Sequence, residues 1–245
     1  MKKFLTLTFN QGQTATAVQV SEPAELSEVL QQMGLIGSRP ILVIVGGASQ
    51  ISEADFVRIQ SLFVKVLAPI AQNLGAYVVD GGTDAGVMQM IGNARNQINA
   101  QFPLIGVAPI AKVILPNQTE PTNDATPLEP HHTHFVLVPG SHWGDESPWM
   151  AQVATILSGG APSVTVLING GEITFTDAVN SVIAERLVMV IAGSGRTADK
   201  LVSALHGETT DERAENLAAS GKLQTIDLEA GWEKLTDTIT NLLST

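Results

Sequence analysis

The sequence contains no cysteine among its 245 residues, which excludes disulfides, zinc–thiolate sites and a thiol nucleophile. It is also poor in aromatic residues, at 4%, and in positive charge, with 13 Lys and Arg against 24 Asp and Glu. The resulting net charge of −11 repels a polyanion such as DNA, and no block of Lys or Arg offsets it. We therefore expect no nucleic-acid partner.

Long hydrophobic runs are absent as well. Apolar segments such as LVMVIAG are far shorter than the roughly 20 residues that cross a bilayer. The N-terminal segment MKKFLTLTF starts with two lysines, but its apolar residues alternate with Thr, unlike the core of a secretory signal. We predict no direct membrane insertion and a cytoplasmic location, with which the lack of cysteine is consistent.

What the sequence does contain is a regular alternation of strand and helix patterns. Short β-branched runs that end in glycine, such as PILVIVGG and AYVVDGG, are typical of strands buried on both faces of a parallel sheet. Amphipathic helical segments follow them, for example from Glu53 to Leu74 and from about Phe175 to Glu185. This alternation predicts an α/β fold, with a Rossmann-like, doubly wound, mainly parallel sheet.

The N-terminal and central segments depart from this alternation. FLTLTF and TATAVQV flank QGQ and predict a β-hairpin, which a helix with Ser21 as its N-cap follows. We divide the chain into a hairpin-helix appendage at 1–38 and a single globular unit at 39–245. Residues 110–131 are rich in Pro, Asn, Thr and Glu and form the longest stretch without a predicted element, which favours a functional or mobile loop.

Glycines follow four of the predicted parallel strands. The carboxyl ends of such strands share one edge of the sheet, where ligands of open α/β sheets bind. Glycine lets a bound group approach the backbone, and the next helix directs N–H groups and its positive dipole end at an anion. One pair of adjacent glycines can also serve tight packing alone. We therefore base the prediction of a ligand site on the recurrence of such pairs at four strand ends. The junctions are Gly46-Gly47, Gly81-Gly82, Gly170-Gly171 and Gly193-Ser194-Gly195.

Polar residues near these junctions are candidates for ligand contacts. Arg196 stands at a helix start, where a cation opposes the dipole, which indicates either an anionic partner or a solvated arginine. Asp199 then pairs with Arg196 or serves the helix dipole. His142, Trp143 and Glu146 follow the strand HFVLV and face the same edge, with Trp143 either stacking on a base or packing at an interface.

Three histidines precede that strand. His132 and His134 would point to one side of a strand, an arrangement that a metal can use, but no other metal motif accompanies them. At the amino end of a strand they are expected to lie opposite the ligand edge. A hydrogen-bonded structural role is favoured for them over metal binding, and no metal site is predicted.

Several motifs together resemble the LSDAT branch of the SLOG superfamily, which includes the cytosolic ligand-sensing region of melastatin-type (TRPM) cation channels. They occur in the family's order between about Pro40 and His206: VIVGGA, VVDGGTDAGVMQMIGNA, LEPHHTHFVLV, VLINGG and VIAGSGRTADKL. The chain looks like a stand-alone prokaryotic member, more distantly similar to Lonely Guy and DprA-type proteins. His132 and His134 match the family's histidine pair.

The resemblance implies a Rossmann-like sheet that binds a nucleotide-derived ligand such as ADP-ribose or an NAD-related compound. It is compatible with a homo-oligomer and with an effector or membrane partner encoded separately. The implied ligand-binding residues combine the junctions with neighbouring positions: Gly46, Gly47, Ala48, Gly81, Gly82, Thr83, Gly86, Val87, His142, Glu146, Gly170, Gly171, Gly193, Ser194, Gly195 and Arg196.

Three functions remain open at the level of sequence. The first is a non-catalytic sensor of that ligand. The second is a nucleotide N-glycosidic hydrolase of Lonely Guy type, with Asp199 or Glu146 as the catalytic acid or nucleophile. Asp199 stands where that family's motif has a glutamate, and its shorter side chain makes this second function harder to support. The third is an oligomeric scaffold that binds no ligand and whose glycine turns only pack helices.

Overall fold

A computed structural model describes residues 4–10, 12–47, 49–50, 52–116, 118, 124–208 and 211–244. Its nine-stranded sheet has the order β1-β2-β8-β5-β4-β3-β9-β10-β11, and among these strands only the β1–β2 pair is antiparallel. The predicted Rossmann-like fold is thereby confirmed. The strands of this sheet are β1 Phe4–Thr8, β2 Thr14–Gln19, β3 Ile41–Gly46, β4 Tyr77–Asp80, β5 Leu104–Pro109, β8 His134–Val138, β9 Ser163–Ile168, β10 Leu187–Ala192 and β11 Leu223–Asp227.

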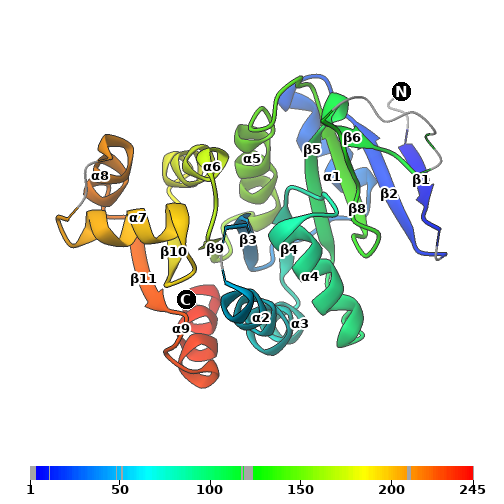
Figure 1. The fold of residues 1–245 in the computed structure, drawn as a ribbon. Coiled ribbons are helices and arrows are strands. Elements are labelled where there is room, and N and C mark those ends of the chain that lie inside the picture. The colour runs from blue at the N-terminus through cyan, green and yellow to red at the C-terminus, as the bar shows by residue number, and fades with distance from the viewer. Residues whose placement is uncertain are drawn as a thin grey trace.

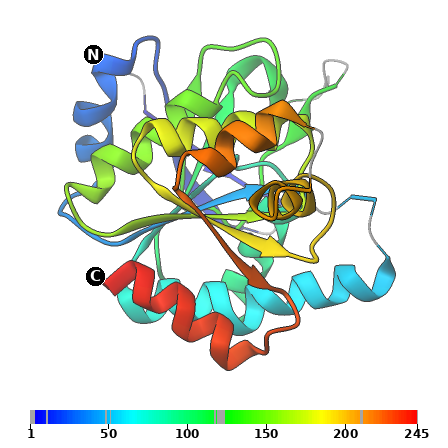
Figure 2. The same cartoon turned by 90° about the vertical axis from the view of Figure 1, so that its left-hand side faces the viewer.

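Helices cover both faces of the sheet, so that the molecule has three layers (Figures 1 and 2). One apolar core joins the sheet to α1, α5, α6, α7 and α8, and a second joins it to α2, α3, α4 and α9. The helices are α1 Leu26–Gln32, α2 Glu53–Leu62, α3 Ala68–Leu74, α4 Gly86–Gln97, α5 Ser147–Ser158, α6 Glu172–Ile183, α7 Arg196–Leu205, α8 Glu212–Ala219 and α9 Trp232–Ser244.

Several expected element bounds need correction. The helix predicted at 53–74 contains a π-helical turn, Phe63–Leu67, between α2 and α3. Helix α6 begins at Glu172 rather than near Phe175, and α8 was not predicted. The 110–131 segment holds a 3₁₀ turn at Ile110–Lys112 and the short parallel pair β6 Val113–Ile114 and β7 Thr126–Pro127 in its described part. It is therefore more ordered than expected.

The N-terminal hairpin extends the main sheet, because β2 pairs in parallel with β8. At the other end, β11 pairs in parallel with β10. The division of the chain at residue 38 remains a prediction.

The strand order reverses beside β3, where a ligand crevice is expected in an open α/β sheet. From β3 the chain proceeds to β4 and β5 on one side, and it later returns to place β9 on the other side. The four glycine junctions follow β4, β3, β9 and β10, which are consecutive strands of the sheet. Folding therefore gathers all four at one edge, around this switch point.

Candidate functional site

A pocket of about 410 Å³ lies at this edge, within the usual range for small-molecule sites. It is lined mainly by the end of β3, by the turn after β4 and by the first turns of α4, α5, α6 and α7. Seven predicted residues line it: Gly46, Gly47, Gly81, Thr83, Glu146, Gly171 and Arg196. The other lining residues are Ile44, Val45, Ala85, Met88, Thr126, Trp143, Met150, Glu172, Ile173, Thr174 and Asp177.

Arg196 reaches across the edge from the turn between β10 and α7. Its Nη1 donates to the hydroxyl of Ser49, 2.8 Å away in the loop after β3. Its Nη2 would lie 3.1 Å from a Cβ built on Gly171. Among the described carboxylates none forms an ion pair with this exposed guanidinium, and Glu172 pairs with Arg213 instead. Arg196 thus offers an unneutralised cation at the pocket.

The backbone of Arg196 is strained, with a φ of +53° at the first residue of α7. A non-glycine residue in this region costs on the order of 1–2 kcal/mol. The arginine is therefore held where its conformation is costly and where its charge opposes the helix dipole. Backbone strain of this kind is concentrated at functional positions. It therefore favours a role for Arg196 in ligand contact over the alternative of a solvated arginine.

Two glycines are required by close backbone approach. Gly46 has a φ of +134°, and a Cβ there would lie 1.8 Å from the carbonyl oxygen of Ile168 on β9. Gly82 has a φ of +68°, and its Cβ would lie 2.7 Å from the Cα of Gly106 on β5. Gly82 therefore lets the turn after β4 pack against β5, whereas Gly46 brings the end of β3 into contact with β9 beside the pocket.

The remaining predicted residues lie outside the pocket lining. Val87 is fully buried in a core, and the side chain of His142 is 83% exposed. The hydroxyl of Ser194 donates to the carbonyl of Ile191 and accepts the N–H of Asn169, which ties the β9 and β10 turns together. Gly82, Gly86, Gly170, Gly193 and Gly195 shape the turns, and Ala48 lies outside the described residues.

Asp199 also stays within its own turn. Its Oδ1 accepts the N–H of Gly193 at 2.8 Å in the first turn of α7, and its side chain is outside the pocket lining. Of the two roles expected for it, the structure thus favours that of an N-terminal helix residue over a partner of Arg196.

Sequence reasoning missed Asp177, which lines the pocket from α6. Its Oδ1 accepts the hydroxyl of Ser147 at 2.5 Å, and its side chain lies close to Glu146. Burial raises the pKa of Asp177 to about 7, a shift that the charge of Glu146 reinforces. Burial also raises the pKa of Glu146. Only the packing of α5 against α6 brings these acids together. No pattern of neighbouring residues in the sequence therefore predicts that they form a pair.

We predict that Asp177→Asn becomes progressively more stable relative to the parent as pH rises from 4 to 8. Because the folded-state pKa of Asp177 is raised, its contribution to stability is complete below the unfolded value near 4 and is lost as pH rises through about 7. Urea unfolding at several pH values should show a gap of a few kcal/mol opening over this range. The exposed Asp237→Asn should show no such trend, and a pH-independent gap for Asp177→Asn would contradict the prediction.

A buried polar network lies beneath the Gly81-Gly82 turn. His132 Nε2 contacts Asp80 Oδ1 at 2.8 Å and its Nδ1 contacts Glu129 Oε2 at 2.7 Å. All three side chains are essentially inaccessible to solvent. Burial alone would lower the pKa of His132, but the charges and hydrogen bonds of Asp80 and Glu129 raise it to about 9. Both ring nitrogens face carboxylates, an arrangement that favours the doubly protonated imidazolium.

This network corrects the expected position of His132, whereas His134 lies at the amino end of β8 as expected. β4 ends at Asp80, which is level with Gly106 on β5 and Phe135 near the start of β8. His132 therefore reaches the carboxyl end of β4, and the expectation that it lies opposite the ligand edge is wrong. Asp80 Oδ1 also accepts the N–H of Gly82, and the carbonyl of Gly82 accepts the N–H of Glu129. His132 thus supports the turn that carries Gly81 and Thr83 to the pocket.

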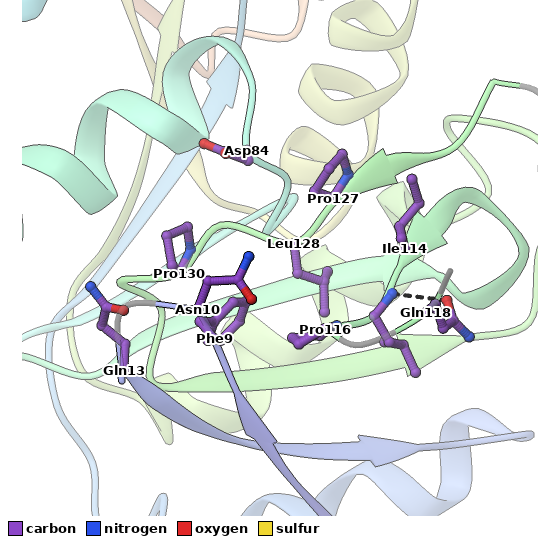
Figure 3. Close-up of a pocket in the computed structure, with 11 residues that line it drawn as sticks. Phe9, Asn10, Gln13, Asp84, Ile114, Pro116, Gln118, Pro127, Leu128 and Pro130 are labelled. Atoms are coloured by element: carbon purple, nitrogen blue, oxygen red, sulfur yellow. Dashed lines mark hydrogen bonds between the residues drawn. The ribbon is translucent and has the colours of Figure 1, made fainter. Parts of the chain in front are cut away.

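A second pocket, of about 320 Å³, lies between the N-terminal hairpin and the 110–131 segment (Figure 3). Phe9, Asn10 and Gln13 line it from the hairpin side, while Ile114, Pro127 and Leu128 line it from the other side. Asp84 supplies a negative charge, and the described lining contains no Lys or Arg. An anionic ligand therefore fits the first pocket, which Arg196 lines and which we call the Arg196 pocket, better than it fits this second pocket.

Comparison with known proteins agrees with this geometry. The prokaryotic LSDAT family, described as "SLOG in TRPM, prokaryote", matches residues 39–236. The chain belongs to this family. The match includes all four glycine junctions and Arg196, and it leaves out the N-terminal hairpin. The resemblance predicted from the motifs is confirmed.

Curated relatives of this LSDAT protein are channel subunits. Transient receptor potential cation channel subfamily M member 2 of Mus musculus is 28% identical over 221 residues, covering 74% of this chain and 14% of the channel. Its Rattus norvegicus counterpart is 27% identical, covering 69% and 13%, and a Nematostella vectensis member-like 2 protein is 24% identical, covering 64% and 12%. The chain thus spans about one seventh of the channels' length. Among its described residues, no helix combines the length and apolar character that a membrane crossing requires.

Proposed function

We propose that the protein is a sensor that binds a nucleotide-derived ligand of the ADP-ribose or NAD-related class in the Arg196 pocket. The observation that carries the proposal is Arg196 itself, a strained cation that has no ion-pair partner among the described residues and is held over the N-terminus of α6 and beside the Gly46-Gly47 turn. A phosphate there would meet a guanidinium and the positive end of a helix dipole. The sequence similarity to TRPM channels supports the same sensor function.

A largely apolar wall complements this anion site. Ile44, Met88 and Met150 line the pocket, and the half-buried Trp143 both lines it and packs against the core beside the hairpin. Flat or apolar ligand groups bind well to Met and Trp side chains, and a nucleobase is such a group. The combination of one cation, glycine turns and an apolar wall fits a nucleotide better than it fits a free inorganic anion.

The proposal predicts stabilisation by ligand. A nucleotide present at 100 times its Kd stabilises the fold by about 2.7 kcal/mol, which raises the Tm of a chain this long by roughly 5–10 °C. Thermal-shift measurements with ADP-ribose, NAD, AMP and cyclic nucleotides would detect this. The absence of any shift at millimolar concentration for every nucleotide would overturn the proposal.

A second candidate function is N-glycosidic hydrolysis of a nucleotide, favoured by the two buried acids in the same pocket. A carboxyl group with a raised pKa can donate a proton to a leaving base, and a neighbouring carboxylate can activate water. Glu146 and Asp177 provide that pair, whereas Asp199 does not line the pocket. Chromatography of AMP after incubation separates the two functions, because the hydrolase releases adenine and the sensor returns AMP intact.

A further inference from the structure

Glu146 and Asp177 form an acid pair on the α5–α6 side of the pocket. Glu146 precedes α5 and accepts the N–H of Gly144 through Oε2 at 2.8 Å, while Asp177 projects from α6 toward the start of α5. The two residues are only 7% and 8% exposed, respectively, yet both line the cavity. Each acid is thus buried by protein on most sides and opens to the ligand space.

Among the described residues, the pair has hydrogen-bond partners but no cationic partner. No described Lys or Arg forms an ion pair with either residue. Asp177 uses Oδ1 to accept the Ser147 hydroxyl, and no described residue donates to its Oδ2. Burying a carboxyl without full hydrogen bonding is costly, and such sites are usually completed by a ligand or by water.

Asp177 is also set apart, along helix α6, from the end of the helix over which Arg196 lies. The guanidinium lies over Gly171, the N-cap of α6, and Asp177 lies six residues further along that helix. At 1.5 Å per residue this separation is about 9 Å along the helix axis. A ligand that reaches both must therefore carry an anionic group and, several bonds away, groups that donate hydrogen bonds to a carboxylate.

We propose that Glu146 and Asp177 recognise the vicinal hydroxyls of a pentose whose phosphate is bound by Arg196. This inference rests on the proposed function and narrows its ligand class to ribosyl phosphates, which the site would prefer over deoxyribosyl phosphates. Hydroxyls donate to carboxylate oxygens in strong, charge-assisted hydrogen bonds. A site built to bind a hydroxyl discriminates strongly against the analogue that lacks it, because the buried acceptor is then left unpaired.

Calorimetric titration of AMP, 2′-deoxy-AMP and 3′-deoxy-AMP tests the inference. We expect one or both deoxy compounds to bind about 10- to 100-fold more weakly than AMP to the parent protein. In Asp177→Asn and in Glu146→Gln this preference should fall at least several-fold. Glu212→Gln is the matched control, because Glu212 is exposed on α8 and lies outside the pocket lining, and it should keep the preference.

The outcomes separate this inference from the proposed function. If AMP and both deoxy compounds bind the parent equally, and Arg196→Gly weakens them all, the nucleotide site stands and the diol inference is overturned. Retention of the preference in both acid variants, with native circular dichroism, overturns it as well. If no nucleotide binds the parent protein, the proposed function fails and this inference with it.

Discussion

Replacing Arg196 with glycine is expected to stabilise the protein while weakening the nucleotide binding that we propose. Arg196 has a φ of +53°, which glycine adopts without the cost of a Cβ, so the free energy of unfolding should rise by about 1 kcal/mol. The same change removes the charged donor that spans the pocket to Ser49. Loss of hydrogen bonds from a charged group should weaken ADP-ribose or AMP binding by about 10- to 100-fold.

Urea unfolding and isothermal titration on the same preparations measure both quantities. Lys200→Ala, on the exposed surface of the same helix, is the matched control and should leave binding nearly unchanged. A destabilised Arg196→Gly variant with undiminished affinity would show that the arginine serves the fold instead of the ligand.

The second large effect concerns the network under the Gly81-Gly82 turn. Among the described residues, His132 is the only cation that contacts both Asp80 and Glu129, so His132→Gln leaves Asp80 buried without a cationic partner, while Glu129 keeps its contact with His131. Removing one partner of a buried ion pair typically costs about 3–5 kcal/mol. For a chain of this length we expect the Tm to fall by roughly 6–20 °C.

The effect has a pH signature that separates it from simple loss of packing. Because the folded-state pKa of His132 is raised to about 9, its stabilisation is complete below the unfolded value near 6.5 and is lost as pH rises through 9. The parent protein should therefore lose clearly more stability between these values than His132→Gln does. The exposed His142→Gln should behave like the parent. A parent whose stability is flat from pH 6.5 to 9 would contradict the assignment.

The sheet and the glycine edge were predictable because they follow from local patterns. Continuous apolar runs such as Ile41–Val45 specify buried parallel strands, and the glycines that follow them lie at one edge in any parallel arrangement. Arg196 was identified for the same reason, since a cation at a helix start conflicts with the local dipole. Information of this kind is carried by neighbouring residues in the sequence.

The acid pair and the histidine network depend on packing between distant segments. Asp177 meets Ser147 from 30 residues away, and His132 meets Asp80 from 52 residues away. The position of His132 depends further on β4 being only four residues long, which places the end of one strand level with the start of another. Strand length and stagger are set by the whole sheet, so the sequence alone led us to place His132 at the wrong edge.

The most direct measurement is a crystal structure of the protein grown with ADP-ribose. We predict electron density for the ligand in the pocket between Gly46-Gly47 and Gly171, with an anionic oxygen within hydrogen-bonding distance of the Arg196 guanidinium and a ribose near Glu146 and Asp177. Density for the ligand in the second pocket, which Phe9 and Leu128 line, or on the outer surface, with no contact to Arg196, would contradict the assignment of the site.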